Sequence, residues 1–421
     1  MTNLKGNNMY CRSCGSDLLD LVIDLGNQPP SNFLLNFDDL NTRESFFPLK
    51  IMKCRRCELL QTQDFLESKE LFGKQYPYFS STSKSWIEHS EKFFKLITNQ
   101  LRLNSTSKVI ELASNDGYLL KFFKDADIKV LGIEPTNSAA NISRSFGIPT
   151  IESFFTSVLA NQIVKDFGVA DLIIANNVLA HVPDLKDFIV GTSILLKEDG
   201  VLTIEFPSAI SLVKDCLFDT IYHEHFSYLT LTSVKTALEL CDLTIFKVEE
   251  LATHGNSLRI FAQHRVGARL IDNSVATILQ KEFRYYENQG FYLEDFVHKL
   301  QNKKLDVLSF LRYQKNVGFR IAAYGAAAKG NTFLNYCDIN SELIDYVVDN
   351  APLKIDKYLP GSHIPIVKEE TLFKNTPNII VVLAWNVFDE IFSRLQNLFR
   401  DYPEQILVCA FQPHFRFRLI N

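Results

Sequence analysis

The sequence predicts an α/β protein with three parts: a small N-terminal zinc-binding module, a central doubly wound domain, and a second doubly wound domain at the C-terminus. Three observations support this prediction. The 421 residues suffice for about three domains of roughly 100–200 residues each. Two C-x-x-C pairs lie near the N-terminus. Farther along the chain, two separate regions alternate short apolar segments with amphipathic helical segments. We place the domain boundaries at 1–70, 71–300 and 301–421.

The composition excludes several classes of protein. Hydrophobic residues make up 46% of the chain and charged residues 22%, with a formal net charge of -5, as is usual for a globular protein. The sequence has no long lysine and arginine cluster, so we expect no nucleic-acid partner. Residues 1–10 contain no apolar signal segment, and no stretch reaches the ~18 apolar residues that a membrane helix needs. We therefore expect a cytoplasmic protein with no membrane partner.

The first part is predicted from four of the eight cysteines, which form two C-x-x-C pairs. These residues are Cys11, Cys14, Cys54 and Cys57. Four thiolates can bind zinc tetrahedrally and leave no position for water, so we expect a structural metal. The alternative is that the four cysteines form two redox-active pairs or are simply buried thiols. That alternative explains neither the repeated spacing nor the position of the pairs beside hydrophilic turns. The single cysteines are expected in the hydrophobic core: Cys216, Cys241, Cys337 and Cys409.

The central domain begins at residue 107, where apolar runs at 108–112, 130–133, 171–175 and 201–206 read as strands of a parallel sheet. The turn after the first strand, 111–117, opens a predicted helix at 118–124. A dinucleotide-binding turn would carry G-x-G-x-x-G, whereas this turn has one glycine, Gly117, and two acids, Glu111 and Asp116. Acids at this sheet edge suit a cationic ligand, and Glu134 ends the second strand where a carboxylate can bind a ribose. S-adenosylmethionine fits this pattern; a helix-capping turn is the alternative.

Four further segments, together with the cysteine pairs, carry a resemblance to a known family. They are residues 109–120, 175–184, 222–228 and 324–332. The chain resembles the S-adenosylmethionine-dependent sugar C-methyltransferases over essentially its whole length, in particular the 3-C-methyltransferases of nucleotide-linked 4-keto deoxysugars. The resemblance implies a Rossmann-like central methyltransferase domain, a Rossmann-like C-terminal domain that closes on the sugar nucleotide, and S-adenosylmethionine and structural zinc as cofactors.

The resemblance also implies a set of site residues. It places in the active site Tyr76, His181, Tyr222, Glu224 and His225. It assigns to the cofactor Glu111, Ala113, Ser114, Asn115, Asp116, Gly117, Tyr118, Leu119, Glu134, Pro135, Asn176 and Asn177. Tyr76 would reach over the ligands as a lid, and His181 would donate a hydrogen bond to the cofactor or an enolate.

Methylation of a sugar carbon requires a neighbouring ketone and a general base. Tyr222, His223, Glu224 and His225 follow the predicted strand 201–206, and His225 is our candidate base. A solvated loop with incidental charge is the alternative for this segment. In the expected mechanism, His225 removes the proton from carbon 3, hydrogen-bond donors hold the enolate, and carbon 3 attacks the sulfonium methyl group.

The remaining segments predict where the acceptor binds. A hairpin of strands at 244–251 and 258–263 ends the central sheet, a helical connector spans 273–317, and a second alternating unit has strands at 319–325, 344–349, 379–385 and 406–411. The turn 325–332 lacks the Walker lysine but offers amides and Lys329 to an anion. Asp349 resembles a ribose-binding acid, although the glycine spacing departs from that of a dinucleotide site. The candidate substrate-binding residues are Tyr78, Ser80, His254, Asn256, Arg259, Lys329, Asn331 and Thr332.

Taken together, these features predict an enzyme that methylates carbon 3 of a 4-keto-6-deoxy sugar linked to a nucleotide, thymidine diphosphate by default. We favour a monomer. Two alternatives stay open from sequence: an NAD(P)-dependent nucleotide-sugar oxidoreductase that uses the third domain, and a non-catalytic module that binds zinc and S-adenosylmethionine.

Overall fold

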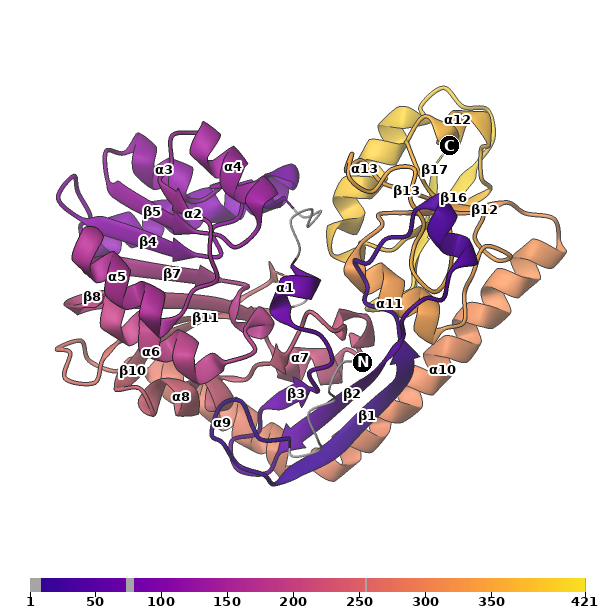
Figure 1. Cartoon of the computed structure of the whole chain (residues 1–421). Helices are drawn as coiled ribbons and strands as arrows, with labels where there is room; N and C mark the ends of the chain where they lie inside the picture. Colours follow the sequence, from indigo (N-terminus) through magenta and orange to yellow (C-terminus); the bar gives the residue numbers. More distant parts are fainter. Residues whose placement is uncertain (1–8, 73–78, 254–255, 421) are drawn as a thin grey trace.

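The computed structural model describes residues 9–72, 79–253 and 256–420 (Figure 1). The central and C-terminal sheets lie on opposite arms of the molecule, and the N-terminal strands and the long helix α10 cross its base. None of the described helices is both long enough and apolar enough to cross a membrane.

The N-terminal sheet has four strands in the order β1-β2-β3-β9, all antiparallel. Its strands are β1 (Leu19–Gln28), β2 (Phe47–Cys54), β3 (Leu60–Thr62) and β9 (Ser227–Tyr228). The last strand comes from the middle of the chain, directly after the segment that ends at His225 and Phe226. The N-terminal sheet therefore holds one end of the segment that carries the candidate base.

The central sheet has seven strands in the order β10-β11-β8-β7-β4-β5-β6. The strands are β4 (Lys108–Leu112), β5 (Lys129–Ile133), β6 (Thr150–Ile151), β7 (Ala170–Asn176), β8 (Leu196–Pro207), β10 (Leu243–Leu251) and β11 (Ser257–His264). Its helices are α2 (Lys84–Leu101), α3 (Leu120–Asp125), α4 (Asn137–Ser145), α5 (Ser157–Asp166), α6 (Leu185–Leu195), α7 (Ala209–Lys214) and α8 (Leu231–Glu239). Strands β4 to β8 are parallel, and the β10–β11 hairpin adds antiparallel strands at β8. The strand order reverses between β4 and β7, which opens a crevice at their carboxyl ends.

The C-terminal sheet has six strands in the order β14-β13-β12-β15-β16-β17, the last one antiparallel. The strands are β12 (Ile321–Tyr324), β13 (Tyr346–Val348), β14 (Ile366–Val367), β15 (Ile379–Val382), β16 (Ile406–Ala410) and β17 (Arg416–Ile420). The helices of this region are α9 (Asn273–Glu287), α10 (Gln289–Asn316), α11 (Ala328–Tyr336), α12 (Thr371–Lys374) and α13 (Phe388–Leu398). Helices α9 and α10 form the predicted connector, and α11 follows the turn after β12.

Three predicted strands of the C-terminal sheet are too long: 319–325 against β12, 344–349 against β13 and 379–385 against β15. The last of these shows why. The prediction runs from 379 to 385, but β15 ends at Val382 and Trp385 begins the short 3-10 turn η6 (Trp385–Val387). Leu383 and Trp385 are buried like the strand before them. An apolar run continues through a buried turn, so hydrophobicity alone cannot show where the strand stops.

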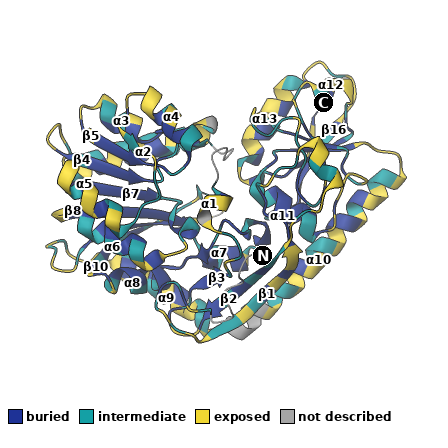
Figure 2. Ribbon diagram, viewed as in Figure 1, coloured by how far each residue is buried: buried dark blue, intermediate teal, exposed yellow. Residues whose placement is uncertain are grey.

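The hydrophobic cores join the three parts of the chain. One cluster of buried side chains includes Ile51 of the N-terminal sheet, Phe218 of the central region and Val381 of the C-terminal sheet. A second cluster packs Cys54 and Cys57 against the central sheet. Figure 2 shows the buried residues along all three sheets, with exposed residues on the outer helices. The single cysteines Cys216, Cys241, Cys337 and Cys409 are all buried, as predicted.

Candidate active site

The four predicted metal ligands converge in the N-terminal module. The Sγ atoms of Cys11, Cys14, Cys54 and Cys57 all lie within 4.8 Å of one another. Cys11 and Cys57 are 3.3 Å apart and Cys14 and Cys54 are 3.6 Å apart, close to the roughly 3.8 Å sulfur separation expected when four thiolates surround zinc at ~2.3 Å. The Cys11 thiol and burial raise the pKa of Cys57, because a second thiolate beside the first is unfavourable without a cation. The thiols therefore fit a closed, structural zinc site.

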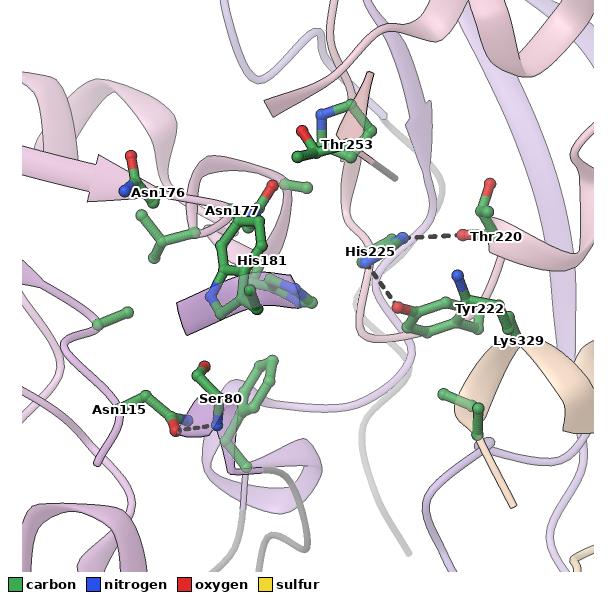
Figure 3. A pocket seen from close by; sticks show the side chains of 18 of the residues that line it. Ser80, Asn115, Asn176, Asn177, His181, Thr220, Tyr222, His225, Thr253 and Lys329 are labelled. Carbon is green, nitrogen blue, oxygen red and sulfur yellow. Dashed lines mark hydrogen bonds between the residues drawn. The ribbon is translucent and has the colours of Figure 1, made fainter. Parts of the chain in front are cut away.

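One large cavity of about 1290 Å³ lies between the central and C-terminal sheets. Its walls include the turns after β4, β5 and β7, the segment that ends at His225, and the turns after β12 and β15. Figure 3 shows the labelled side chains of Asn115, Asn176 and Asn177 on one side of His181, and those of Tyr222 and Lys329 on the far side of His225. The edges of the central and C-terminal sheets therefore face the same cavity.

The turn after β4 has an unusual backbone, with three alternating residues in the left-handed region. Their φ angles are 56° at Ala113, 49° at Asn115 and 79° at Gly117. A Cβ atom at Gly117 would lie 2.6 Å from Ile148 Cδ1, so the glycine is required by both its φ angle and its surroundings. Seven of the predicted cofactor residues line the cavity: Ala113, Asn115, Tyr118, Glu134, Pro135, Asn176 and Asn177. The others are buried behind the turn or within it: Glu111, Ser114, Asp116, Gly117 and Leu119.

Three carboxylates gather at this turn. Burial raises the pKa of Glu111 well above its usual value, and the charges of Asp116 and Glu134 add to the effect. Burial also raises the pKa of Glu134, although its Oε2 accepts a hydrogen bond from the Asn115 backbone at 3.0 Å. Negative charge is thus unfavourable here unless a cation is present.

The asparagines at the end of β7 carry polar atoms that are buried without a partner. Asn176 ends β7 and Asn177 follows it; Asn176 Oδ1 and both amide atoms of Asn177 are buried and have no hydrogen-bond partner among the described residues. Both residues belong to the cavity wall, where a hydrogen-bonding ligand would lie beside them. On the other side, Asn115 Oδ1 accepts a hydrogen bond from the Ser80 backbone at 2.8 Å, which ties the segment before α2 to the turn (Figure 3).

His225 is held by hydrogen bonds at both ring nitrogens (Figure 3). Its Nδ1 lies 2.8 Å from the Thr220 carbonyl oxygen, and its Nε2 lies 2.7 Å from the Tyr222 hydroxyl. Because a carbonyl can only accept, Nδ1 carries the proton and Nε2 accepts from Tyr222. The lone pair of His225 is therefore on Nε2, where it accepts the Tyr222 hydrogen bond; to act as a general base, Nε2 must exchange this bond for the substrate proton.

His181 lies beside this base, with its ring 4.6 Å from the ring of His225. Its Nδ1 donates to the Glu224 carbonyl oxygen at 2.8 Å, and burial lowers the pKa of His181 to about 4. The ring is therefore neutral at pH 7, with its proton on Nδ1. Nε2 of His181 is an acceptor, whereas the resemblance implied a donor to the cofactor or an enolate.

Glu224 lies apart from the other candidate catalytic groups. Its carboxylate is buried and its Oε2 accepts a hydrogen bond from Asn32 Nδ2 at 2.7 Å, next to the N-terminal sheet. It is not among the residues that line the cavity, whereas Tyr222, His225 and His181 are. Tyr76 lies outside the described residues.

The predicted acceptor residues divide into three groups. Ser80 and Lys329 line the cavity. Lys329 Nζ donates to Asn386 Oδ1 at 2.9 Å and lies 4.6 Å from the centre of the Trp385 ring. The remaining described residues do not line it: Asn256, Arg259, Asn331 and Thr332. Tyr78 and His254 lie outside the described residues.

Arg259 is engaged in a buried ion cluster behind the cavity. Its guanidinium lies 2.7 Å from Glu205 Oε2 and 2.9 Å from His89 Nε2, and His89 in turn lies 3.0 Å from the same carboxylate oxygen. His89 and Thr253 line the cavity and both contact Glu205. From sequence, His89 reads only as a structural or surface residue, because nothing nearby in the chain marks contacts among α2, β8 and β11.

Asp349 lines the cavity and accepts two backbone hydrogen bonds. Its two carboxylate oxygens accept hydrogen bonds at 2.8 Å from the backbone amides of Ala326 and Ala351. The carboxylate thus supports the turn after β12.

The fold and the site define a methyltransferase that uses S-adenosylmethionine and carries a zinc-binding module. Three family models match the chain: "Putative zinc binding domain" at residues 11–72, "Methyltransferase domain" at 86–248 and "C-methyltransferase C-terminal domain" at 252–408. C-methyltransferase NovU of Streptomyces niveus is 33% identical over 383 residues, which cover 91% of this chain and 91% of that protein. The chain belongs to this family of C-methyltransferases.

Solved structures match the chain more weakly. The magnesium protoporphyrin IX methyltransferase of Synechocystis PCC 6803 with bound SAM is 12% identical, with a TM-score of 0.36, and the match covers 48% of this chain and 99% of that one. A SAM-dependent methyltransferase of Anabaena variabilis is 18% identical, with a TM-score of 0.32, over 42% of this chain and 85% of that one. The predicted fold class, enzyme class and cofactors are confirmed by the family and by the cysteine cluster.

Proposed function

We propose that the enzyme transfers a methyl group from S-adenosylmethionine to carbon 3 of a 4-keto-6-deoxy sugar linked to a nucleotide, thymidine diphosphate by default. The observation that carries the proposal is His225, which lies in the wall of the cavity and whose Nδ1 donates to the Thr220 carbonyl oxygen, so that its basic nitrogen is Nε2. Carbon 3 of such a sugar must lose a proton before it can attack the methyl group, so this reaction requires a base beside the acceptor.

The residues around the cavity suit each stage of this reaction. S-adenosylmethionine supplies, when bound, a methyl group on a positively charged sulfur, and Asn115, Glu134 and Asn176 would hold it. His225 Nε2 takes the proton from carbon 3, and the electron pair of the broken C–H bond passes to the ketone oxygen as an enolate. In the structure the Tyr222 hydroxyl donates to Nε2; once Nε2 has taken the proton it no longer accepts, and the hydroxyl is released to donate to that oxygen.

The acceptor would extend toward the C-terminal sheet. Lys329 lies in the first turn of α11, where backbone amides also point outward, and a diphosphate suits both. Burial lowers the pKa of Lys329, while Asp219 opposes the shift. The domain boundaries at 1–70, 71–300 and 301–421, a monomeric state and a cytoplasmic location belong to this proposal.

The test combines a substrate panel with one variant. The protein is incubated with labelled S-adenosylmethionine and several 4-keto nucleotide sugars, and NMR locates the methyl group. His225→Ala should keep cofactor binding but lose about 10²–10⁴-fold in methyl transfer and in deuterium exchange at carbon 3. His298→Ala, on the exposed face of α10, serves as the matched control. Undiminished exchange in His225→Ala would remove His225 from the role of base.

A further inference from the structure

A buried hydrogen bond connects the C-terminal domain to the segment that carries the candidate base. Trp385 Nε1 donates to Asp219 Oδ2 at 2.6 Å, and both residues are buried. Trp385 begins η6, in the C-terminal domain, whereas Asp219 lies in η4 (Phe218–Thr220), in the central region. The ring of Phe218 also packs on Phe333 of α11, with ring centres 5.9 Å apart. The turn η4 is therefore held in place by contacts from the C-terminal domain.

The residue after Asp219 holds the tautomer of His225. The Thr220 carbonyl oxygen is the acceptor 2.8 Å from His225 Nδ1, and because a carbonyl can only accept, it places the ring proton on Nδ1 rather than on Nε2. Asp219 and Thr220 belong to one short 3-10 turn, whose residues move together because its hydrogen bonds span three residues. We expect a shift of Asp219 to be passed to the Thr220 carbonyl, because Thr220 is the next residue along the same turn.

Several groups stabilise the charge on Asp219, but one side-chain hydrogen bond comes from the C-terminal domain. Burial raises the pKa of Asp219, and the shift is opposed by the charge of Lys329, the Trp385 hydrogen bond, the charge of Lys303 and the residue's own backbone amide, in that order. Lys329 lies 4.6 Å from the centre of the Trp385 ring. The other carboxylate oxygen, Oδ1, is buried and has no hydrogen-bond partner among the described residues. Removing the indole N–H therefore takes away the side-chain hydrogen bond that orients this carboxylate.

We propose that Asp219 and Trp385 are positioning residues that hold His225 in its Nδ1-protonated form through the Thr220 carbonyl. The proposal rests on the proposed function in one respect, since a catalytic consequence requires that His225 is the base. In this arrangement the C-terminal domain helps to orient the base and also forms a wall of the cavity.

The experiment reads the tautomer directly. Nitrogen NMR of the full-length protein labelled with ¹⁵N-histidine distinguishes a protonated from an unprotonated ring nitrogen, and His225→Ala identifies the His225 signals. Trp385→Phe keeps an aromatic ring over Lys329 but removes the N–H donor. We expect the ratio of Nδ1-protonated to Nε2-protonated His225 to fall about fivefold or more in Trp385→Phe.

Matched variants separate this effect from a general loss of structure. Tyr346→Phe also removes a buried donor in the C-terminal sheet, one that bonds the Asn375 carbonyl oxygen at 2.6 Å, and should leave the His225 signals unchanged. Asp219→Asn keeps an oxygen acceptor for the indole and should retain the wild-type signals, whereas Asp219→Leu should behave like Trp385→Phe. If Trp385→Phe does not fold, the two Asp219 variants decide the question.

Two results would overturn the proposal: unchanged His225 signals in Trp385→Phe or in Asp219→Leu, or the same change in Tyr346→Phe. Kinetics of the methyl acceptor found in the substrate panel give the second readout, with kcat expected to fall by no more than the tautomer ratio falls and KM to stay within about twofold. If His225 is not the base, the NMR change persists while kcat does not follow it. The failure of the proposed function is thus distinguishable from the failure of the positioning role.

Discussion

Gly117 offers the sharpest test of how the cofactor turn is built. Its φ angle is +79°, and an added Cβ would lie 2.6 Å from Ile148 Cδ1 and 2.8 Å from Ser143 Oγ. Both neighbours are buried, and the Ser143 hydroxyl lies 2.8 Å from Thr150 Oγ1, so neither can move without loss of contacts. Gly117→Ala must therefore strain the backbone and displace the turn.

The size of the effect follows from two contributions. A residue with a Cβ in the left-handed region costs about 1–2 kcal/mol, and overpacking of a filled core costs about 1–3 kcal/mol more. Gly26 has a φ angle of +75°, and a Cβ added there would meet nothing within 4 Å, so Gly26→Ala isolates the backbone contribution. We expect destabilisation of roughly 2–5 kcal/mol for Gly117→Ala and about 1–2 kcal/mol for Gly26→Ala.

Denaturant unfolding measures the stability of both variants, and calorimetry measures their affinity for S-adenosylmethionine. The affinity of Gly117→Ala should fall at least about tenfold, because the displaced turn no longer presents Ala113 and Asn115 to the cavity. Gly26→Ala should bind as the wild type does. Equal destabilisation of the two variants, or undiminished affinity in Gly117→Ala, would refute the reasoning.

Three further predictions concern buried charge and the metal. The pKa of Glu111 is raised above 4.5 in the folded protein, so as pH rises this carboxyl ionises in the unfolded chain first and the wild type loses stability above that pH. Without cofactor, the stability of Glu111→Gln relative to the wild type should therefore rise with pH by up to about 1.4 kcal/mol per pH unit. A difference in unfolding free energy that does not depend on pH would contradict this. Cys57→Ser should lower bound zinc by elemental analysis and lower the melting midpoint; full zinc content would argue against the four-thiolate site. Arg259→Leu should destabilise the protein by about 3–5 kcal/mol, because the buried charge of Glu205 loses its partner. The double variant Arg259→Leu with Glu205→Leu should recover part of this stability, as measured by denaturant unfolding. A double variant no more stable than Arg259→Leu would show that the ion pair is not the cause.

The strands of the two doubly wound sheets could be predicted from sequence because they are buried on both faces. The strand predicted at 108–112 is β4 residue for residue, and the predicted 406–411 differs from β16 by one residue. Such strands appear in the sequence as continuous apolar runs, bounded by turns. The metal site could be predicted from the cysteine pairs in the same way, because the ligands of such sites recur at a characteristic spacing.

The contacts that organise the active site could not be predicted, because they join residues far apart in the chain. Asn32 binds Glu224, Trp385 binds Asp219, and His89 meets Glu205 and Arg259. No local period or spacing marks such pairs, which form only when separate sheets pack together. The sequence therefore indicated the chemistry of His225 but not the groups that orient it.

The pairing of β3 with β9 has a consequence for biosynthesis. Leu60 and Gln61 pair with Tyr228 and Ser227, so the N-terminal sheet stays incomplete until the ribosome has released the chain beyond residue 228. Until then the β3 edge exposes unpaired backbone groups, a surface prone to pairing with other chains. The zinc module leaves the ribosome before the central sheet but finishes folding only after much of that sheet has been made.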